Sequence, residues 1–190
     1  MRFLVAFLLL TLVPKAQALE EIFTWQSLAG EFNQILVDST QGSRVESNGS
    51  FRILRPGYAA WVVNQPDPEE FHLSPEGLWH FDPWLEVASF HAAEALEAAS
   101  AIALLSGDID ALREDYEISA NAGTVMLLAR GDQGQIEYIE LILDQNTIPK
   151  HMVIQTRLAR SLEIAFINAH LADLRVSDLS FVPPEGVEIQ

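Results

Sequence analysis

The sequence has no cysteine and few basic residues. Its 190 residues include 11 lysines and arginines against 27 aspartates and glutamates, so the formal net charge is −16. Without cysteine the chain has no disulfide framework, no thiolate zinc site and no cysteine nucleophile, and it has no cysteine that could carry a lipid. The charge argues against a nucleic-acid-binding protein, which needs a basic face against the phosphates.

Catalytic motifs are missing as well. The sequence contains no G-x-S-x-G nucleophile elbow, no H-E-x-x-H zinc motif and no glycine-rich phosphate loop. His72 and His80 lie in neighbouring predicted strands and could form a metal pair, but a chance pairing across a hairpin is the preferred interpretation because no third ligand is evident. We therefore expect neither an enzyme nor a protein with a bound metal or cofactor.

The one long apolar run stands at the N-terminus. Residues 1–2 are Met-Arg, residues 3–13 are apolar, and residues 14–18 (PKAQA) end in small residues at the positions that a signal peptidase reads. A run of this length cannot cross a bilayer core, which takes about 20 residues, whereas the three-part pattern is typical of a secretory signal peptide. We predict a signal peptide over residues 1–18, cleavage after Ala18, and export to a compartment such as the periplasm.

The exported chain is expected to form one domain over residues 19–190. With 49% hydrophobic residues the sequence is too apolar for a disordered acidic tail, and its length corresponds to a single domain. We attribute most of the carboxylates to a solvated surface that keeps the protein soluble.

Alternation of apolar and polar residues predicts many short strands. In residues 44–54, for example, Val45, Phe51 and Ile53 fall on one face and mostly polar residues on the other, which is typical of a half-buried antiparallel strand. A segment at residues 84–91 follows an Asp-Pro corner. The other expected strands are 31–38, 58–65, 69–74, 77–82, 116–120, 124–130, 135–143, 151–158 and 162–169, and a last strand carries 181–187.

Two segments favour helix instead. Residues 20–28 have acidic residues in what would be the first turn. Residues 92–105 are rich in alanine and leucine, and Ala95, Ile102 and Leu105 form part of an apolar stripe at helical spacing. The whole pattern predicts a mainly β fold with α: about ten or eleven antiparallel strands that curl into a barrel or half-barrel, with the helix placed to plug or cover it.

Large aromatic residues concentrate between residues 32 and 90. They fit an ordinary filled core, and they fit equally well a concave apolar cavity for acyl chains that the helix closes. Residues 135–143 are apolar on both faces, so some of the sheet is covered on both sides or lines a cavity on one side. Periodicity cannot separate the two interpretations, because a filled core and an empty cavity need the same side chains.

Specific strings carry a family resemblance. They are residues 28–34 (LAGEFNQ), 49–57 (GSFRILRPG) with Trp61 following, 77–83 (GLWHFDP), 104–108 (LLSGD) and 181–187 (FVPPEGV). In this order and spacing, behind a signal peptide, they resemble the LolA family, the outer-membrane lipoprotein carrier proteins of the periplasm. The resemblance extends over nearly all of residues 19–190.

The resemblance implies a fold, an activity and partners. It implies an unclosed antiparallel β-barrel with a helical lid over a hydrophobic cavity, acting as a monomeric chaperone. Such a chaperone takes acylated lipoproteins from an inner-membrane ABC lipoprotein-releasing complex, shields their acyl chains and delivers them to an outer-membrane receptor. That receptor is itself a lipoprotein with a lipidated cysteine, so this cysteine-free chain corresponds to the carrier. The candidate cavity residues are Phe32, Phe51, Ile53, Trp61, Phe71, Trp79, Phe81, Ile102 and Leu105.

Arg55 is the candidate latch of the lid. It shares strand parity with Phe51 and Ile53 and is therefore expected on the concave side, where a charge needs partners. In the family the matching arginine hydrogen-bonds the lid backbone and holds the empty cavity shut. The plainer interpretation is an arginine at the end of a strand that turns to solvent before Pro56.

Three other functions stay open. The chain could carry another outer-membrane lipid or a glycolipid in the same fold, since a fold does not determine its ligand. It could be an envelope enzyme without a recognised motif, or an interaction module with a filled core. The sequence also departs from the family pattern: the N-terminal helix is short, Ala59 stands where a larger residue is common, and the exported chain is unusually acidic.

Overall fold

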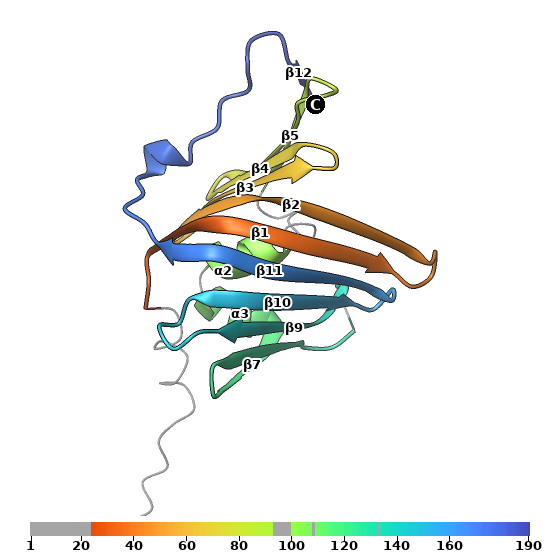
Figure 1. Cartoon of the computed structure of the whole chain (residues 1–190), viewed down its shortest axis with the longest axis vertical. Helices are drawn as coiled ribbons and strands as arrows, with labels where there is room; N and C mark the ends of the chain where they lie inside the picture. The colour runs from red at the N-terminus through yellow and green to blue at the C-terminus, as the bar shows by residue number, and fades with distance from the viewer. Residues whose placement is uncertain (1–23, 93–99, 108, 133) are drawn as a thin grey trace, which may run out of the picture.

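The chain forms one large curved sheet. A computed structural model describes residues 24–92, 100–107, 109–132 and 134–190. In these residues twelve strands form a sheet in the order β12-β6-β5-β4-β3-β2-β1-β11-β10-β9-β8-β7 (Figure 1). The strands are β1 Ser27–Asp38, β2 Ser43–Leu54, β3 Tyr58–Gln65, β4 Glu69–Ser74, β5 Gly77–Asp82, β6 Val87–Ala92, β7 Tyr116–Asn121, β8 Thr124–Ala129, β9 Ile136–Leu143, β10 Pro149–Thr156, β11 Arg160–Leu171 and β12 Glu188–Ile189.

The sheet is antiparallel and unclosed. Within the described residues only the short pairing of β12 with β6 is parallel, and the central pairs of β1 with β2 and with β11 are long antiparallel ladders. β7 and β12 stand at the two ends of the strand order and do not pair with each other. The predicted unclosed antiparallel sheet is therefore confirmed.

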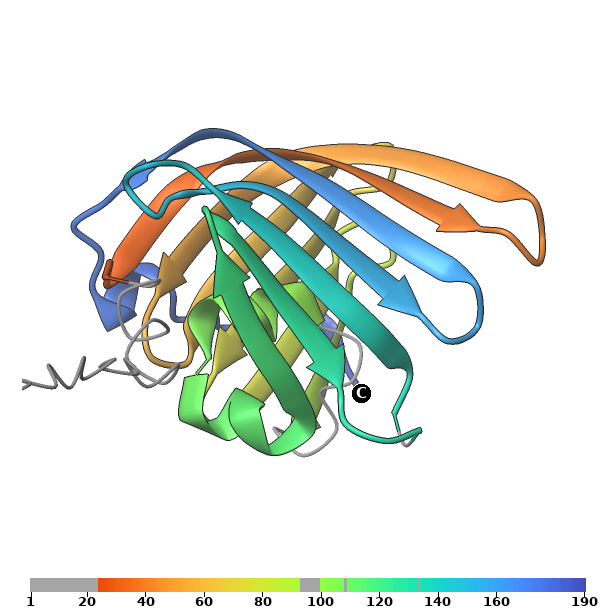
Figure 2. The same cartoon turned by 90° about the horizontal axis from the view of Figure 1, so that it is seen from below.

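Two short helices lie inside the curve of the sheet. α2 (Ser100–Ser106) packs against β2 and β3, and α3 (Ile109–Asp115) packs against β7. Figure 2 shows both helices below the concave face, while the hairpins β1–β2 and β10–β11 project beyond them. In the part of the chain that the structure describes, the concave face is thus covered at one end and open toward the hairpin tips.

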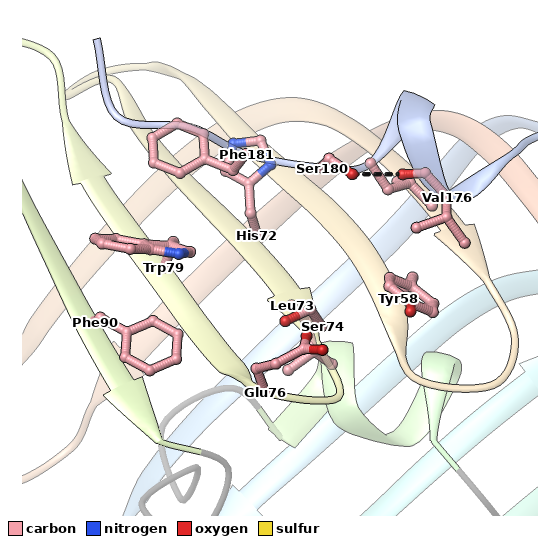
Figure 3. Close-up of a pocket in the computed structure, with 11 residues that line it drawn as sticks. Tyr58, His72, Leu73, Ser74, Glu76, Trp79, Phe90, Val176, Ser180 and Phe181 are labelled. Carbon is pink, nitrogen blue, oxygen red and sulfur yellow. Dashed lines mark hydrogen bonds between the residues drawn. The ribbon is translucent and has the colours of Figure 1, made fainter. Parts of the chain in front are cut away.

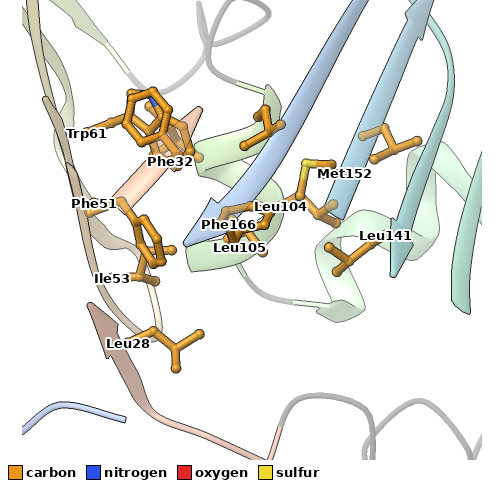
Figure 4. Packing of buried hydrophobic residues seen from close by; sticks show 14 of the residues in the cluster. Leu28, Phe32, Phe51, Ile53, Trp61, Leu104, Leu105, Leu141, Met152 and Phe166 are labelled. Atoms are coloured by element: carbon orange, nitrogen blue, oxygen red, sulfur yellow. The ribbon is translucent and has the colours of Figure 1, made fainter. Parts of the chain in front are cut away.

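The main core lies between the concave face and α2 (Figure 4). Leu105 of α2 is fully buried against the sheet. On the sheet, the ring of Phe32 on β1 lies against Gly49 of β2, where an added Cβ would lie 2.7 Å from the ring and 1.9 Å from the carbonyl oxygen of Val62 on β3. The close approach of these two strands therefore depends on glycine at this position.

The C-terminal segment covers the other face of β4, β5 and β6. After β11 a short 3-10 helix, Val176–Asp178, leads to Leu179, which is buried. Phe181 then stacks on His72 with ring centroids 4.4 Å apart. β12 joins the edge strand β6. The C-terminal segment therefore adds a second, partial cover to this half of the sheet.

The strand predictions were the most accurate. β3, β4 and β5 have the predicted bounds 58–65, 69–74 and 77–82. Residues 93–99, the first part of the predicted alanine-rich helix, lie outside the described residues, as does the predicted signal peptide. Among the described residues, no helix has the length and apolar character that crossing a membrane requires.

Three segment predictions were wrong. A helix was expected over residues 20–28, but its described end, from residue 24, is not helical. Ser27 and Leu28 begin β1, because pairing with β2 and β11 outweighs local helix preference. The helix expected over 92–105 was wrong only at its start: α2 confirms the part from Ser100 onward, but the helix cannot begin at Ala92, which ends β6. The last strand is residues 188–189 and not 181–187, because the prolines at 183 and 184 have no N–H for a ladder.

Candidate functional site

A cavity of about 420 Å³ lies on the concave face. Its walls come from strands at both sides of the sheet and from α2, so the curvature of the sheet creates it. Such a volume falls in the range of small-molecule and lipid sites, which are mostly apolar with a few polar groups. The lining residues are Gln34, Leu36, Trp61, Val63, Glu69, Phe71, Leu78, Ile102, Gln135, Ile136, Ile154, Thr156, Arg160, Ser161, Leu162 and Ile164.

An aromatic cluster forms the wall nearest the helices. Phe32 and Trp61 stack with ring centroids 4.0 Å apart and planes 20° apart. Phe51 lies 5.8 Å from Trp61 and meets Phe166 edge to face at 5.4 Å. Figure 4 shows these rings beside Leu105 of α2. The interlocked rings give this end of the cavity a rigid apolar floor.

Arg55 connects the β2–β3 turn to the end of α2. Its Nη2 donates a hydrogen bond to the carbonyl oxygen of Gly107, 2.8 Å away, and its guanidinium carbon lies 5.4 Å from the centre of the Trp25 ring. The backbone N–H of Gly57 donates to the carbonyl of Ser106 at 2.7 Å. The arginine thus contacts the residue that directly follows α2, and it is partly buried.

The structure divides the predicted cavity residues into three groups. Trp61, Phe71 and Ile102 line the cavity. The second group, Phe32, Phe51, Ile53 and Leu105, is buried in the adjoining core.

Trp79 and Phe81 form the third group and lie outside the cavity. Their rings pack near Phe181 of the C-terminal segment, at 6.0 and 5.8 Å. Neighbouring residues of a strand point to opposite faces. On β5 it is Leu78 that points into the cavity.

Sequence reasoning missed most of the aliphatic walls. Val63, Leu78, Ile136, Ile154, Leu162 and Ile164 line the cavity without having been singled out. What identifies these residues as cavity walls is which residues they face across neighbouring strands. Ile164 pairs with Gln34 and Met152, and Leu162 pairs with Leu36 and Ile154, so the strand register places them on one face.

The end of the cavity near the hairpin tips contains an ion pair whose carboxylate is buried and whose guanidinium is half exposed. Arg160 Nε donates to Asp38 Oδ2 at 2.7 Å, and the Asp38 side chain is 7% exposed. The other oxygen of Asp38 accepts from the hydroxyl and backbone N–H of Thr40 and from the N–H of Gln41. The Thr40 hydroxyl and the Arg160 guanidinium lower the pKa of Asp38 to about 2 from 3.8.

This pKa predicts a pH-dependent contribution to stability. A carboxylate whose pKa is lower in the folded than in the unfolded chain stabilises the fold above its unfolded pKa, and the stabilisation is lost as the pH falls through the folded value. The wild type should therefore unfold at a higher urea concentration than Asp38→Asn at pH 7, and this difference should shrink between about pH 4 and pH 2. An equal difference at pH 7 and pH 2 would contradict it.

A second pocket of about 460 Å³ lies on the convex face, between β3–β6 and the C-terminal segment (Figure 3). His72 lies at this pocket, and its Nε2 is 2.9 Å from Glu70 Oε2. His80 instead stacks on Phe71, with centroids 4.6 Å apart, on the concave side. The two histidines therefore lie on opposite faces of the sheet and do not form a pair. The described residues contain no group of three or more side chains placed to hold a metal ion.

Comparison with known families matches most of the chain. Residues 24–181 match the family model described as outer membrane lipoprotein carrier protein LolA. An outer-membrane lipoprotein carrier protein from Halorhodospira halophila is 28% identical over 175 residues, covering 91% of this chain and 84% of that protein. One from Haemophilus ducreyi is 24% identical over 162 residues, covering 85% and 77%.

Solved structures share the fold. The LolA superfamily protein from Nitrosomonas europaea aligns with a TM-score of 0.52 at 9% identity, over 88% of this chain and 96% of that one. An uncharacterized conserved protein from Thermus thermophilus aligns with a TM-score of 0.56 at 10% identity, over 93% and 99%. At these identities the likeness concerns the fold alone.

Proposed function

Because the chain belongs to the outer membrane lipoprotein carrier protein LolA family, we propose that it is a periplasmic carrier that shields the acyl chains of lipoproteins in its concave cavity. The observation that supports this most is the cavity itself. It is lined mainly by aliphatic and aromatic side chains, and α2 covers one end. No covalent step is needed, since the carrier only has to bind and release.

The physical need for such a carrier is large. Each acyl CH₂ group that is moved from an apolar site into water costs about 0.8 kcal/mol. A lipoprotein with two or three acyl chains therefore cannot cross an aqueous compartment at a useful rate without cover. Burial in an apolar cavity offsets this cost during transit.

The proposal includes a route. A signal peptide over residues 1–18, cleaved after Ala18, would export the chain, which would act as a monomer. It would accept lipoproteins from an inner-membrane ABC lipoprotein-releasing complex and pass them to an outer-membrane receptor. The strong negative charge would suit basic docking faces on those partners, and in that case docking weakens as salt is added.

The direct test uses purified mature protein. Added to spheroplasts, it should release a newly made lipoprotein into the soluble fraction, and the complex should then transfer that lipoprotein to outer membranes. Mass spectrometry of the lipid that copurifies from the native periplasm identifies the cargo. A glycolipid or other free lipid in place of a lipoprotein would contradict the proposed cargo.

A cavity variant tests where the acyl chains bind. Leu162→Gln puts an amide on the partly buried cavity wall, and a buried amide without a partner is costly. We expect affinity for a fluorescent fatty-acid probe to fall about tenfold. The matched control is Leu158→Gln, in the β10–β11 turn outside the cavity lining and 63% exposed, which should bind like the wild type. Equal binding by both variants would place the acyl chains elsewhere.

A further inference from the structure

The two ends of the concave cavity differ in polarity. At the end covered by α2, the lining consists of rings and aliphatic chains, including Trp61, Phe71 and Ile102. Apart from Glu69, the polar lining residues lie toward the other end. Gln34 is on β1, Gln135 precedes β9, Thr156 ends β10, and Arg160 and Ser161 begin β11. An amphiphilic ligand would therefore have a preferred direction in the cavity.

Arg160 is the best-positioned donor at the polar end. Its Nε is fixed by Asp38, and its backbone N–H and carbonyl both bond the hydroxyl of Thr156, at 3.2 and 3.1 Å. Asp38 is itself held by the turn at Thr40 and Gln41. The Arg160 side chain remains 51% exposed, and within the described residues only Asp38 accepts from its guanidinium. The terminal N–H groups are thus preorganised and free to donate.

The surrounding charges favour a neutral acceptor. The positive charge of Arg160 is balanced by Asp38 at 2.7 Å, and Glu69 stands in the lining of the same cavity. The whole chain carries a net charge of −16. A phosphate or free carboxylate would gain little attraction here, whereas a carbonyl oxygen needs only an N–H donor.

We propose that the Arg160 end of the cavity is a subsite for the ester carbonyl oxygens of a diacylglyceryl group. The inference rests on the proposed carrier function and gives it a direction. The acyl tails extend from Arg160 toward Trp61 and α2, and the attached polypeptide leaves the cavity past the tips of the β1–β2 and β10–β11 hairpins, which project into open space (Figure 2).

The subsite can be tested with two matched probes. One is a fluorescent lipopeptide with a diacylglyceryl cysteine, and the other is its dialkyl ether, which has the same tails without carbonyl groups. We expect Arg160→Met to lower affinity for the ester probe about tenfold and to leave the ether probe within twofold, because one charge-assisted hydrogen bond is lost. Arg157→Met is the matched control, because Arg157 lies in the adjacent turn and bonds the Gly131 carbonyl instead.

The outcomes separate the two proposals. If Arg160→Met weakens both probes equally, the arginine acts only through the fold and the subsite is wrong, while the carrier function stands. If neither probe binds the wild type, the carrier function fails and the subsite fails with it. A loss for the ester probe alone supports both, because a loss of fold stability from breaking the pair with Asp38 would weaken the two probes alike.

The absence of cysteine allows a direct test of direction. A single cysteine replaces exposed Gln41 at the β1–β2 tip or exposed Glu114 on α3, and each is labelled with a photocrosslinker in the complex with a bound lipoprotein. We expect the cargo polypeptide to crosslink at position 41 and not at position 114. Crosslinking at position 114 alone would reverse the direction and overturn the proposal.

Discussion

Arg55→Leu is expected to trap cargo in the carrier. The substitution removes the hydrogen bond to the Gly107 carbonyl, which as a charge-assisted bond contributes about 1.5–3 kcal/mol to the closed arrangement. The open, lipid-bound state should gain roughly ten- to a hundredfold over the closed state. Lipoprotein should therefore still leave spheroplasts, but its transfer from the carrier to outer membranes should slow by a similar factor.

Two further variants isolate this effect. Arg52→Leu removes a nearby exposed arginine, on the face of β2 opposite Phe51 and Ile53, and it should transfer cargo at the wild-type rate. Arg55→Lys keeps a donor and should restore part of the rate. The latch role is lost if Arg55→Leu delivers lipoprotein to the receptor membrane as fast as the wild type.

Among the substitutions proposed here, Gly49→Val should cause the largest loss in the free energy of unfolding. A Cβ at this position would lie 1.9 Å from the Val62 carbonyl oxygen and 2.7 Å from the Phe32 ring. Backbone cannot yield as a flexible side chain does, so β2 and β3 must separate and the stacked rings of Phe32 and Trp61 must shift. We expect a loss of roughly 3 kcal/mol in the free energy of unfolding.

The measurement is urea unfolding of the mature protein, followed by tryptophan fluorescence. Ser50→Val is the control, because Ser50 is the next residue along β2 and lies on the other face. A change there should stay within about 0.5 kcal/mol. Equal unfolding midpoints for Gly49→Val and the wild type would show that the strands can accommodate the side chain.

Local pattern was sufficient to predict individual strands. β3, β4 and β5 are short, alternate cleanly and are bounded by proline and glycine turns, so their bounds could be read directly. Arg55 was found from parity with Phe51 and Ile53 together with its family string. In each case the signal lies within a dozen residues of chain.

Features that depend on distant pairing could not be read this way. Phe71 is paired with His80, so the residues on either side of His80, including Trp79, must point to the opposite face. That conclusion needs the register of the hairpin, which the strand bounds do not give. Arg160 is 122 residues from Asp38, and neither residue carries a local signal. Ser27 became strand because β2 and the residue that follows β11 offer it hydrogen bonds.

Because β7 and β12 do not pair, the sheet can change its curvature without losing hydrogen bonds between strands. In a closed barrel the radius follows from strand number and shear, so widening the interior means breaking ladder hydrogen bonds. An open sheet has no such condition: it can flatten by changing its twist while every strand keeps its neighbours. The interior of this protein is therefore adjustable at the expense of the few contacts that hold α2, and in the proposed carrier this would let one sheet fit acyl chains of different number and length.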